Sequence, residues 1–300
     1  MSAALLLLPD FSLILLGAAL RRVMHLGDHF WNGVEKLVYF VLFPALLFNG
    51  LVRTRIDWQA AGPLIAVAAG AMLTAMALGS GLRLFGLAPR QFASLHQCSF
   101  RFNSYIGLAV AGSLHGPAGV AAMAIVVGVM VPPANVTAVY VLARHGEHKV
   151  LRELARNPLI IGTVAGLIAN LAGLQLPEPA LKLLTRLSDA AVALGLLAVG
   201  AGLRMQNRQV GAGRTAASAY LLTVKLLAMP LVALGLARWL GLPPLYADIA
   251  LIFAALPIAS SAFILAQRMG GDGPEVAWQI SASTLLAMLT MPLWLMVAGH

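Results

Sequence analysis

The most informative segment of the chain reads Phe100-Arg101-Phe102-Asn103-Ser104-Tyr105-Ile106-Gly107. This polar cluster falls near the middle of an apolar run that extends from Phe92 to Leu114. A run of about 20 apolar residues is long enough to cross a membrane as a helix. Polar groups and broken backbone are tolerated at that depth only where they are buried in protein or line a cavity. The cluster therefore predicts a broken transmembrane helix that faces an internal cavity.

The rest of the chain has the composition of an all-α integral membrane protein. It is 60% hydrophobic and 10% charged, whereas soluble domains carry about 25% charged residues. Ten apolar runs are long enough to be spanning helices: Ala3–Leu20, Val34–Leu51, Ala60–Leu82, Phe92–Leu114, Ala118–Leu142, Pro158–Leu174, Ala180–Leu203, Thr215–Leu240, Ile249–Met269 and Val276–Ala298.

Two halves of the chain resemble each other. The longest polar stretch, Arg144–Asn157, separates five runs from five. The third run of each half ends alike, as Phe85-Gly86-Leu87-Ala88-Pro89 and Leu240-Gly241-Leu242-Pro243-Pro244. Because five is odd, the second repeat enters the membrane from the opposite side, as in many secondary transporters. We predict a first repeat over residues 1–143, a cytoplasmic linker over 144–157 and an inverted second repeat over 158–300.

The positive charges predict the orientation in the cell (inner) membrane. One side of the predicted topology carries thirteen of the 20 Lys and Arg: Arg21, Arg22, Lys36, Arg83, Arg90, Arg144, Lys149, Arg152, Arg156, Arg204, Arg208, Arg214 and Arg268. The other side has only Arg53, Arg55, Lys182, Arg186 and Arg238. Cytoplasmic loops are the richer in Lys and Arg, so both termini are expected outside the cytoplasm. These charges form no extended basic patch with aromatics, which argues against a nucleic-acid partner despite the net charge of +9.

The candidate binding residues lie where helices are expected to break. In the fourth run, Arg101, Asn103, Ser104 and Tyr105 can hydrogen-bond a carboxylate, or they can form an ordinary polar contact between helices. Proline removes a backbone hydrogen bond and kinks or breaks a helix. The ninth run has such a proline near its midpoint, and the fifth has two prolines beside an Asn. These runs contribute Pro257, Ser260, Ser261 and Asn135.

Three further charged residues lie inside apolar runs. They are Asp10, Asp189 and Lys225. Ionisable groups cost about 2.5–3.5 kcal/mol or more at the centre of a membrane, so they normally face a cavity or a partner. One interpretation is that these residues and Arg101 pair structurally, and the other is that one of them meets an anionic substrate or a coupling proton.

The whole pattern resembles the auxin efflux carrier family, which includes bacterial membrane transport proteins related to the plant PIN carriers. The specific parts are residues 101–108 and 254–266, with Arg156-Asn157-Pro158-Leu159 and Ser281-Ala282-Ser283-Thr284-Leu285-Leu286. The resemblance implies that the fourth and ninth helices are broken and cross each other. It also implies that Asn103 contacts a substrate carboxylate, that Pro257 is the break in the ninth helix, and that Asn135 faces the cavity. The plant carriers have proline where this chain has Phe102.

These observations favour a secondary transporter of small organic anions. The expected substrates are monocarboxylates or dicarboxylates, and the expected mechanism is alternating access of the elevator type. The alternatives are a sodium- or proton-coupled symporter of the bile-acid or cation-antiporter type, and a non-transporting scaffold or sensor. An enzyme is not expected, because the chain has neither HExxH nor GxSxG, and no cofactor or metal is predicted. The expected partners are the substrate anion, membrane lipid and, through small-residue faces such as Gly62 to Gly81, a second copy in a homodimer.

Overall fold

The computed structural model describes residues 3–53, 58–142, 158–203 and 212–299, and it is helical throughout, with no strand in those ranges. The helices of the N-terminal half are α1 (Ala3–Val23), α2 (Asp28–Leu37), the π-helix η1 (Val38–Leu42), α3 (Phe43–Arg53), α4 (Trp58–Gly79), η2 (Ser80–Phe85), α5 (Pro89–His96), η3 (Gln97–Ser99) and α6 (Ser104–Leu142). The C-terminal half contains α8 (Pro158–Leu171), α9 (Glu178–Ala201), α10 (Ala212–Thr223), the π-helix η5 (Val224–Ala228), α11 (Met229–Trp239), α12 (Pro244–Ala255), α13 (Ser261–Arg268) and α14 (Gly273–Ala298).

Helices lie over each of the ten predicted runs, which confirms the all-α class. Within the described part of the chain, six helices are long and apolar enough to cross a membrane: Asp28–Arg53, Ala61–Phe85, Pro89–Leu142, Glu178–Ala201, Arg214–Trp239 and Gly273–Ala298. Two shorter apolar helices are Ile161–Leu171 and Pro244–Ala255. The predicted linker over 144–157 lies outside the described residues.

Glycine and proline set the sharp turns between helices. Gly86 and Gly241 both have positive φ values, 64° and 62°, a conformation that glycine adopts without steric cost. Each is followed by a helix that begins at proline, Pro89 in α5 and Pro244 in α12, where the missing N–H would have no helical partner anyway. The two similar sequence motifs therefore fold into similar turns. Gly116, with φ 57°, divides the long α6 at a kink.

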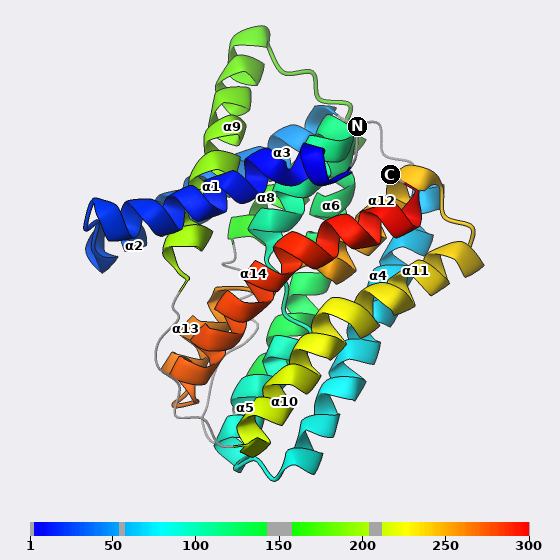
Figure 1. Cartoon of the computed structure of the whole chain (residues 1–300). Helices are drawn as coiled ribbons and strands as arrows, with labels where there is room; N and C mark the ends of the chain where they lie inside the picture. Colours follow the sequence, from blue (N-terminus) through cyan, green and yellow to red (C-terminus); the bar gives the residue numbers. More distant parts are fainter. Residues whose placement is uncertain (1–2, 54–57, 143–157, 204–211, 300) are drawn as a thin grey trace.

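The helices pack in two groups (Figure 1). In the first group α1 packs on α9, and α3 packs on both α8 and α9. In the second group α4, α11, α12 and α14 pack together, with α13 against α14. α6 contacts both groups through α3 and α12. The described part of the chain thus forms two helical bundles that meet along α6 and where α1 contacts α14.

Small residues allow close packing of the helices within the chain. A side chain at Gly17 of α1 would overlap the carbonyl of Leu197 in α9, and one at Gly200 would overlap the carbonyl of Ile14. The predicted face from Gly62 to Gly81 is mixed in this respect: a side chain at Gly81 of η2 would collide with Tyr220, whereas one at Gly62 of α4 would meet no atom of the described residues within 4 Å.

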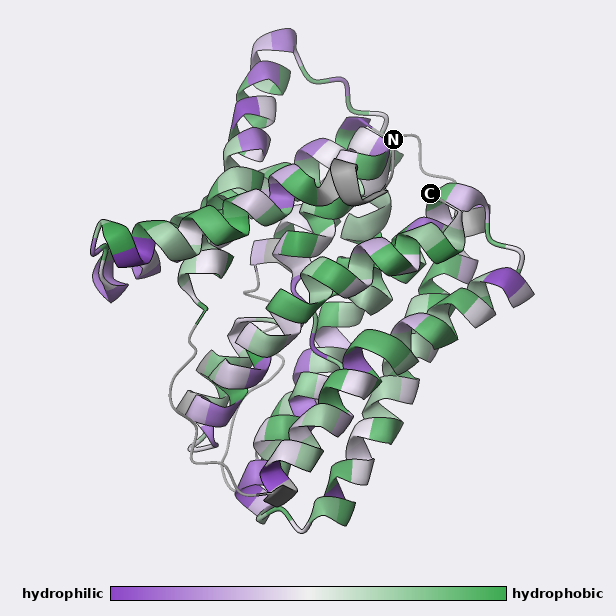
Figure 2. Cartoon of the chain, in the orientation of Figure 1, coloured by the Kyte–Doolittle hydropathy of each residue, from purple (hydrophilic) through white to green (hydrophobic). Residues whose placement is uncertain are grey.

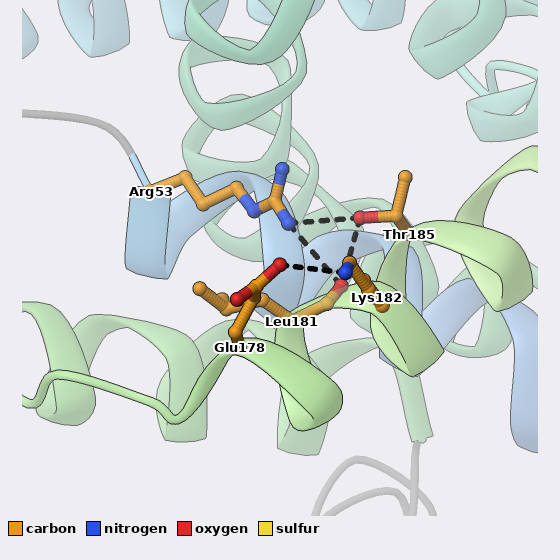
Figure 3. A network of polar contacts seen from close by, with 5 residues as sticks. All are labelled: Arg53, Glu178, Leu181, Lys182 and Thr185. Carbon is orange, nitrogen blue, oxygen red and sulfur yellow. Dashed lines mark hydrogen bonds and ion pairs between the residues drawn. The ribbon is translucent and has the colours of Figure 1, made fainter.

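Hydrophobic residues cover most of the helices, whereas hydrophilic residues gather at helix ends such as the start of α9 (Figure 2). There Arg53 donates hydrogen bonds to the Leu181 carbonyl at 3.2 Å and to Thr185 Oγ1 at 2.8 Å (Figure 3). Lys182 and Glu178 form an ion pair of 2.6 Å beside it. We call the polar contacts between α3 and α9 the α3–α9 seam. Deeper in this seam, Asn49 Nδ2 donates to Ser188 Oγ at 3.1 Å.

Candidate functional site

The site is built on two unwound segments that touch each other. Helical structure stops after Ser99 and resumes at Ser104, and it stops again after Ala255 and resumes at Ser261. The N–H of Asn103 donates to the carbonyl of Pro257 at 3.0 Å. We call residues 100–103 and 256–260, joined by this hydrogen bond, the crossover. Both predicted interruptions are therefore present, and the first occurs without a proline.

Side chains from neighbouring helices stabilise the unwound backbone. Ile258 N–H donates to Ser283 Oγ of α14 at 3.1 Å, and Gln97 Nε2 donates to the Ala262 carbonyl at 3.2 Å. A buried backbone N–H without a partner would cost as much free energy as a lost hydrogen bond. The Phe102 ring also packs edge-on against Phe253 of α12, with centroids 4.7 Å apart.

Asn103 begins the second half of the broken helix. Its Oδ1 accepts hydrogen bonds from the N–H groups of Tyr105 at 3.0 Å and Ile106 at 3.4 Å, so the side chain caps the N-terminus of α6. The Nδ2 of the same amide is buried and has no hydrogen-bond partner among the described residues. An unpartnered buried donor beside the positive end of a helix dipole is suited to a carboxylate oxygen.

Arg101 joins three separate helical pieces at the crossover. Its Nη2 donates to Asn135 Oδ1 of α6 and to Ser261 Oγ of α13, each at 3.0 Å, and its Nη1 donates to Gln97 Oε1 of η3 at 3.3 Å. The whole residue is 8% exposed. The structure thus brings together Arg101, Asn135 and Ser261, three of the residues predicted to form the site.

The other predicted site residues near the crossover form no hydrogen bond with Arg101. Ser104 and Ser260 are half-buried. The ring of Tyr105 stacks on Phe43 of α3, with centroids 4.3 Å apart and an interplanar angle of 12°. This stacking links the start of α6 to the first helical group. Pro257 is buried, and its carbonyl is the acceptor at the centre of the crossover.

The three charged candidates lie in separate places. Asp10 of α1 is buried and accepts a hydrogen bond from Ser113 Oγ at 2.9 Å. Lys225 of η5 is fully buried and its Nζ lies 3.3 Å from the Met229 sulfur. Asp189 of α9 is exposed. Within the described ranges, none of the three forms an ion pair with another or with Arg101. The interpretation that these charges pair with one another for structural reasons is therefore wrong.

Sequence reasoning missed two buried carboxylates and two polar groups of the crossover. Asp248 of α12 lies 2.9 Å from His115 Nε2. Glu275 of α14 accepts from Ser218 Oγ at 3.0 Å. Each acid directly precedes an apolar run, so hydropathy places it outside the predicted helix. Gln97 and Ser283 gave no local signal, because their importance comes from contacts with another segment.

Several known proteins are similar to this chain in sequence. A family model described as "Membrane transport protein" matches residues 142–295. A Rhizobium meliloti (strain 1021) protein named "Putative malonate transporter" is 25% identical over 95% of this chain and 92% of its own length. An "Uncharacterized transporter" of Methanothermobacter thermautotrophicus is 27% identical over 95% of each chain. A rice protein (Oryza sativa subsp. japonica) named "Probable auxin efflux carrier component 1b" is 29% identical over 46% of this chain and 24% of its own.

Proposed function

Because the chain belongs to this membrane transport protein family, which includes the auxin efflux carriers, it is a transporter and not an enzyme, and we propose that it carries small organic anions. The observation that carries the proposal is the crossover, where the unpartnered Nδ2 of Asn103 lies two residues from the buried Arg101. Donors and a positive charge, with no carboxylate bonded to them, suit an anionic substrate. The name of the Rhizobium relative suggests malonate as the first acid to test.

We propose that the chain crosses the membrane ten times as two inverted repeats, residues 1–143 and 158–300. Matching positions support this topology. The broken helices begin at Pro89 and Pro244, and their second halves begin at Ser104 and Ser261. Discontinuous helices at corresponding positions of two halves are typical of a transporter site at mid-membrane. The positive charges favour an inner-membrane orientation with both termini outside.

Alternating access would follow from movement of one helical group against the other. The mobile group would contain α4, α5, α6 and α10 to α14, which includes the whole crossover. The group of α1 to α3, α8 and α9 would form a fixed scaffold and, in a homodimer, the contact with a second copy. The close approach of α1 and α9 at Gly17 and Gly200 supports a rigid scaffold, because packed interfaces deform little.

Cation-coupled transport is the second candidate, and the buried acids favour it. Asp10, Asp248 and Glu275 are each at most 7% exposed, and carboxylates inside membranes often carry protons or ions. Flux measured with and without sodium and pH gradients would test this mechanism. If Asp10 must titrate during transport, Asp10→Asn removes the pH dependence of flux. A substrate flux that is the same with and without sodium and pH gradients would exclude coupling to either ion.

The central experiment measures uptake of radiolabelled malonate, malate, lactate and indole-3-acetate into liposomes that contain the purified protein. Asn103→Ala removes the free donor and should lower flux about tenfold or more. Asn49→Ala is the matched control, because it removes a buried Asn from the α3–α9 seam instead. Each variant loses about 1 kcal/mol of stability, so stability alone cannot separate them.

Two results would contradict the proposal. A folded wild-type protein that moves none of the four acids would exclude an organic-anion carrier within this range and favour the scaffold or cation-coupled alternatives. A folded Asn103→Ala variant with full flux would show that the substrate site lies away from the crossover.

A further inference from the structure

Among the described residues, the buried guanidinium of Arg101 has only uncharged acceptors. They are the amide oxygens of Gln97 and Asn135 and the hydroxyl of Ser261. A guanidinium carries five N–H donors, and these three hydrogen bonds leave two donors for a further acceptor. An ionised group removed from water without a counter-charge is strongly disfavoured.

No carboxylate of the described residues neutralises this charge. Asp10 bonds Ser113, Asp248 pairs with His115, and Glu275 accepts from Ser218. The other buried cation in those ranges, Lys225, contacts Met229 and offers no compensation. The crossover therefore holds a net positive charge that an anion from outside the chain can balance.

A second donor lies beside that charge. Asn103 is two residues from Arg101 along the unwound segment, so their Cα atoms are at most about 7 Å apart. Asn103 is only 3% exposed, and its Nδ2 has no partner among the described residues. This donor and the N-terminus of α6 can together hold one carboxylate. A short molecule with two carboxylates can give this donor and Arg101 a charged acceptor each, whereas a monocarboxylate has a single negative charge to share between them.

We propose that Arg101 is the specificity-determining residue that makes the site select short dicarboxylates over monocarboxylates. This inference rests on the proposed function, since it assumes that the crossover binds the transported anion. Asn103 would hold one carboxylate of the substrate and Arg101 the other. The substrate dianion would supply the counter-charge that the helices around Arg101 lack.

The sharpest test places a counter-charge inside the protein. Asn135→Asp keeps the size of the side chain and puts a carboxylate where the Oδ1 already lies 3.0 Å from Arg101 Nη2. The paired substrates are malonate and monomethyl malonate at neutral pH, which differ by one charge and one methyl group. We expect wild-type protein to prefer malonate, and Asn135→Asp to lower the malonate-to-ester flux ratio about tenfold or more.

Controls keep the outcomes distinct. Arg101→Gln removes the positive charge itself and should also lower the malonate-to-ester flux ratio. This variant provides the test if Asn135→Asp does not fold. Asn135→Gln keeps the amide and should leave malonate preferred. Wild-type flux of both compounds at equal rates, or a ratio unchanged in both charge variants, overturns the role of Arg101 and leaves the carrier proposal standing. A folded wild-type protein that moves neither compound but moves lactate or indole-3-acetate would overturn the role of Arg101 alone, and one that moves none of these acids would overturn the carrier proposal as well.

Discussion

Arg53 and Arg101 make similar hydrogen bonds in different surroundings. Arg53, at the end of α3, donates to a carbonyl and a hydroxyl of α9 (Figure 3). Arg101, at the crossover, donates to two amide oxygens and a hydroxyl. Neither guanidinium bonds a carboxylate of the described residues. Arg53 is exposed, however, whereas Arg101 is 8% exposed.

The difference in burial separates a structural contact from a binding group. An exposed guanidinium keeps most of its hydration, so its contacts contribute little to stability, between about 0 and 1 kcal/mol. A buried guanidinium has lost that hydration and gains from any counter-charge that reaches it. The α3–α9 seam is therefore expected to hold two helices together, and the crossover to respond to ligand.

The largest expected effect is on ligand-dependent stability. Malonate at about 100 times its dissociation constant should stabilise the wild-type protein by about 2.7 kcal/mol, because it binds only the folded state. Arg101→Gln should remove most of this gain, since the variant lacks the charge that binds the second carboxylate. Thermal unfolding in detergent, with and without malonate, measures the difference. An undiminished malonate shift in the variant would remove the distinction between the two arginines.

A smaller effect is expected from the backbone of the crossover. Ser283→Ala deletes the acceptor of the Ile258 N–H, whose hydrogen bond is buried. A buried donor left without a partner costs about 1–3 kcal/mol. The free energy of unfolding, measured by denaturant titration in micelles, should fall by that amount while malonate still stabilises the protein. Thr284→Val is the control, because Thr284 Oγ1 bonds the Ile280 carbonyl within its own helix at 2.8 Å.

Local signals in the sequence predicted the two helix interruptions, and the family resemblance implied that they cross, but neither predicted the side chains that support them. The interruptions at residues 100–103 and at Pro257 could be predicted because polar residues and proline oppose a continuous apolar helix. Gln97 and Ser283 could not, because each acts on a segment 25 or more residues away. Such pairings depend on how the helices pack.

Exposure was the second property that sequence did not reveal. Asp189 lies inside an apolar run yet is exposed on α9, whereas Asp248 and Glu275 precede their apolar runs and are buried. Hydropathy averages over a window and therefore places a residue along a helix but not on one of its faces. α12 begins at Pro244, five residues before the predicted start at Ile249, and this extension is what brings Asp248 inside.

The smallest effect is expected at the exposed end of the α3–α9 seam. Thr185→Val removes one acceptor of Arg53 and keeps the shape of the side chain, while the Leu181 carbonyl still accepts from the same guanidinium. Exposed contacts of this kind change stability by about 0.5 kcal/mol or less. Malonate flux and malonate-dependent stabilisation should both match wild type in the same liposome and micelle assays. A variant that folds but loses flux would mean that the seam moves during transport. The fixed scaffold assigned to α3 and α9 would then be wrong, because a contact that only joins two static helices cannot limit the transport rate.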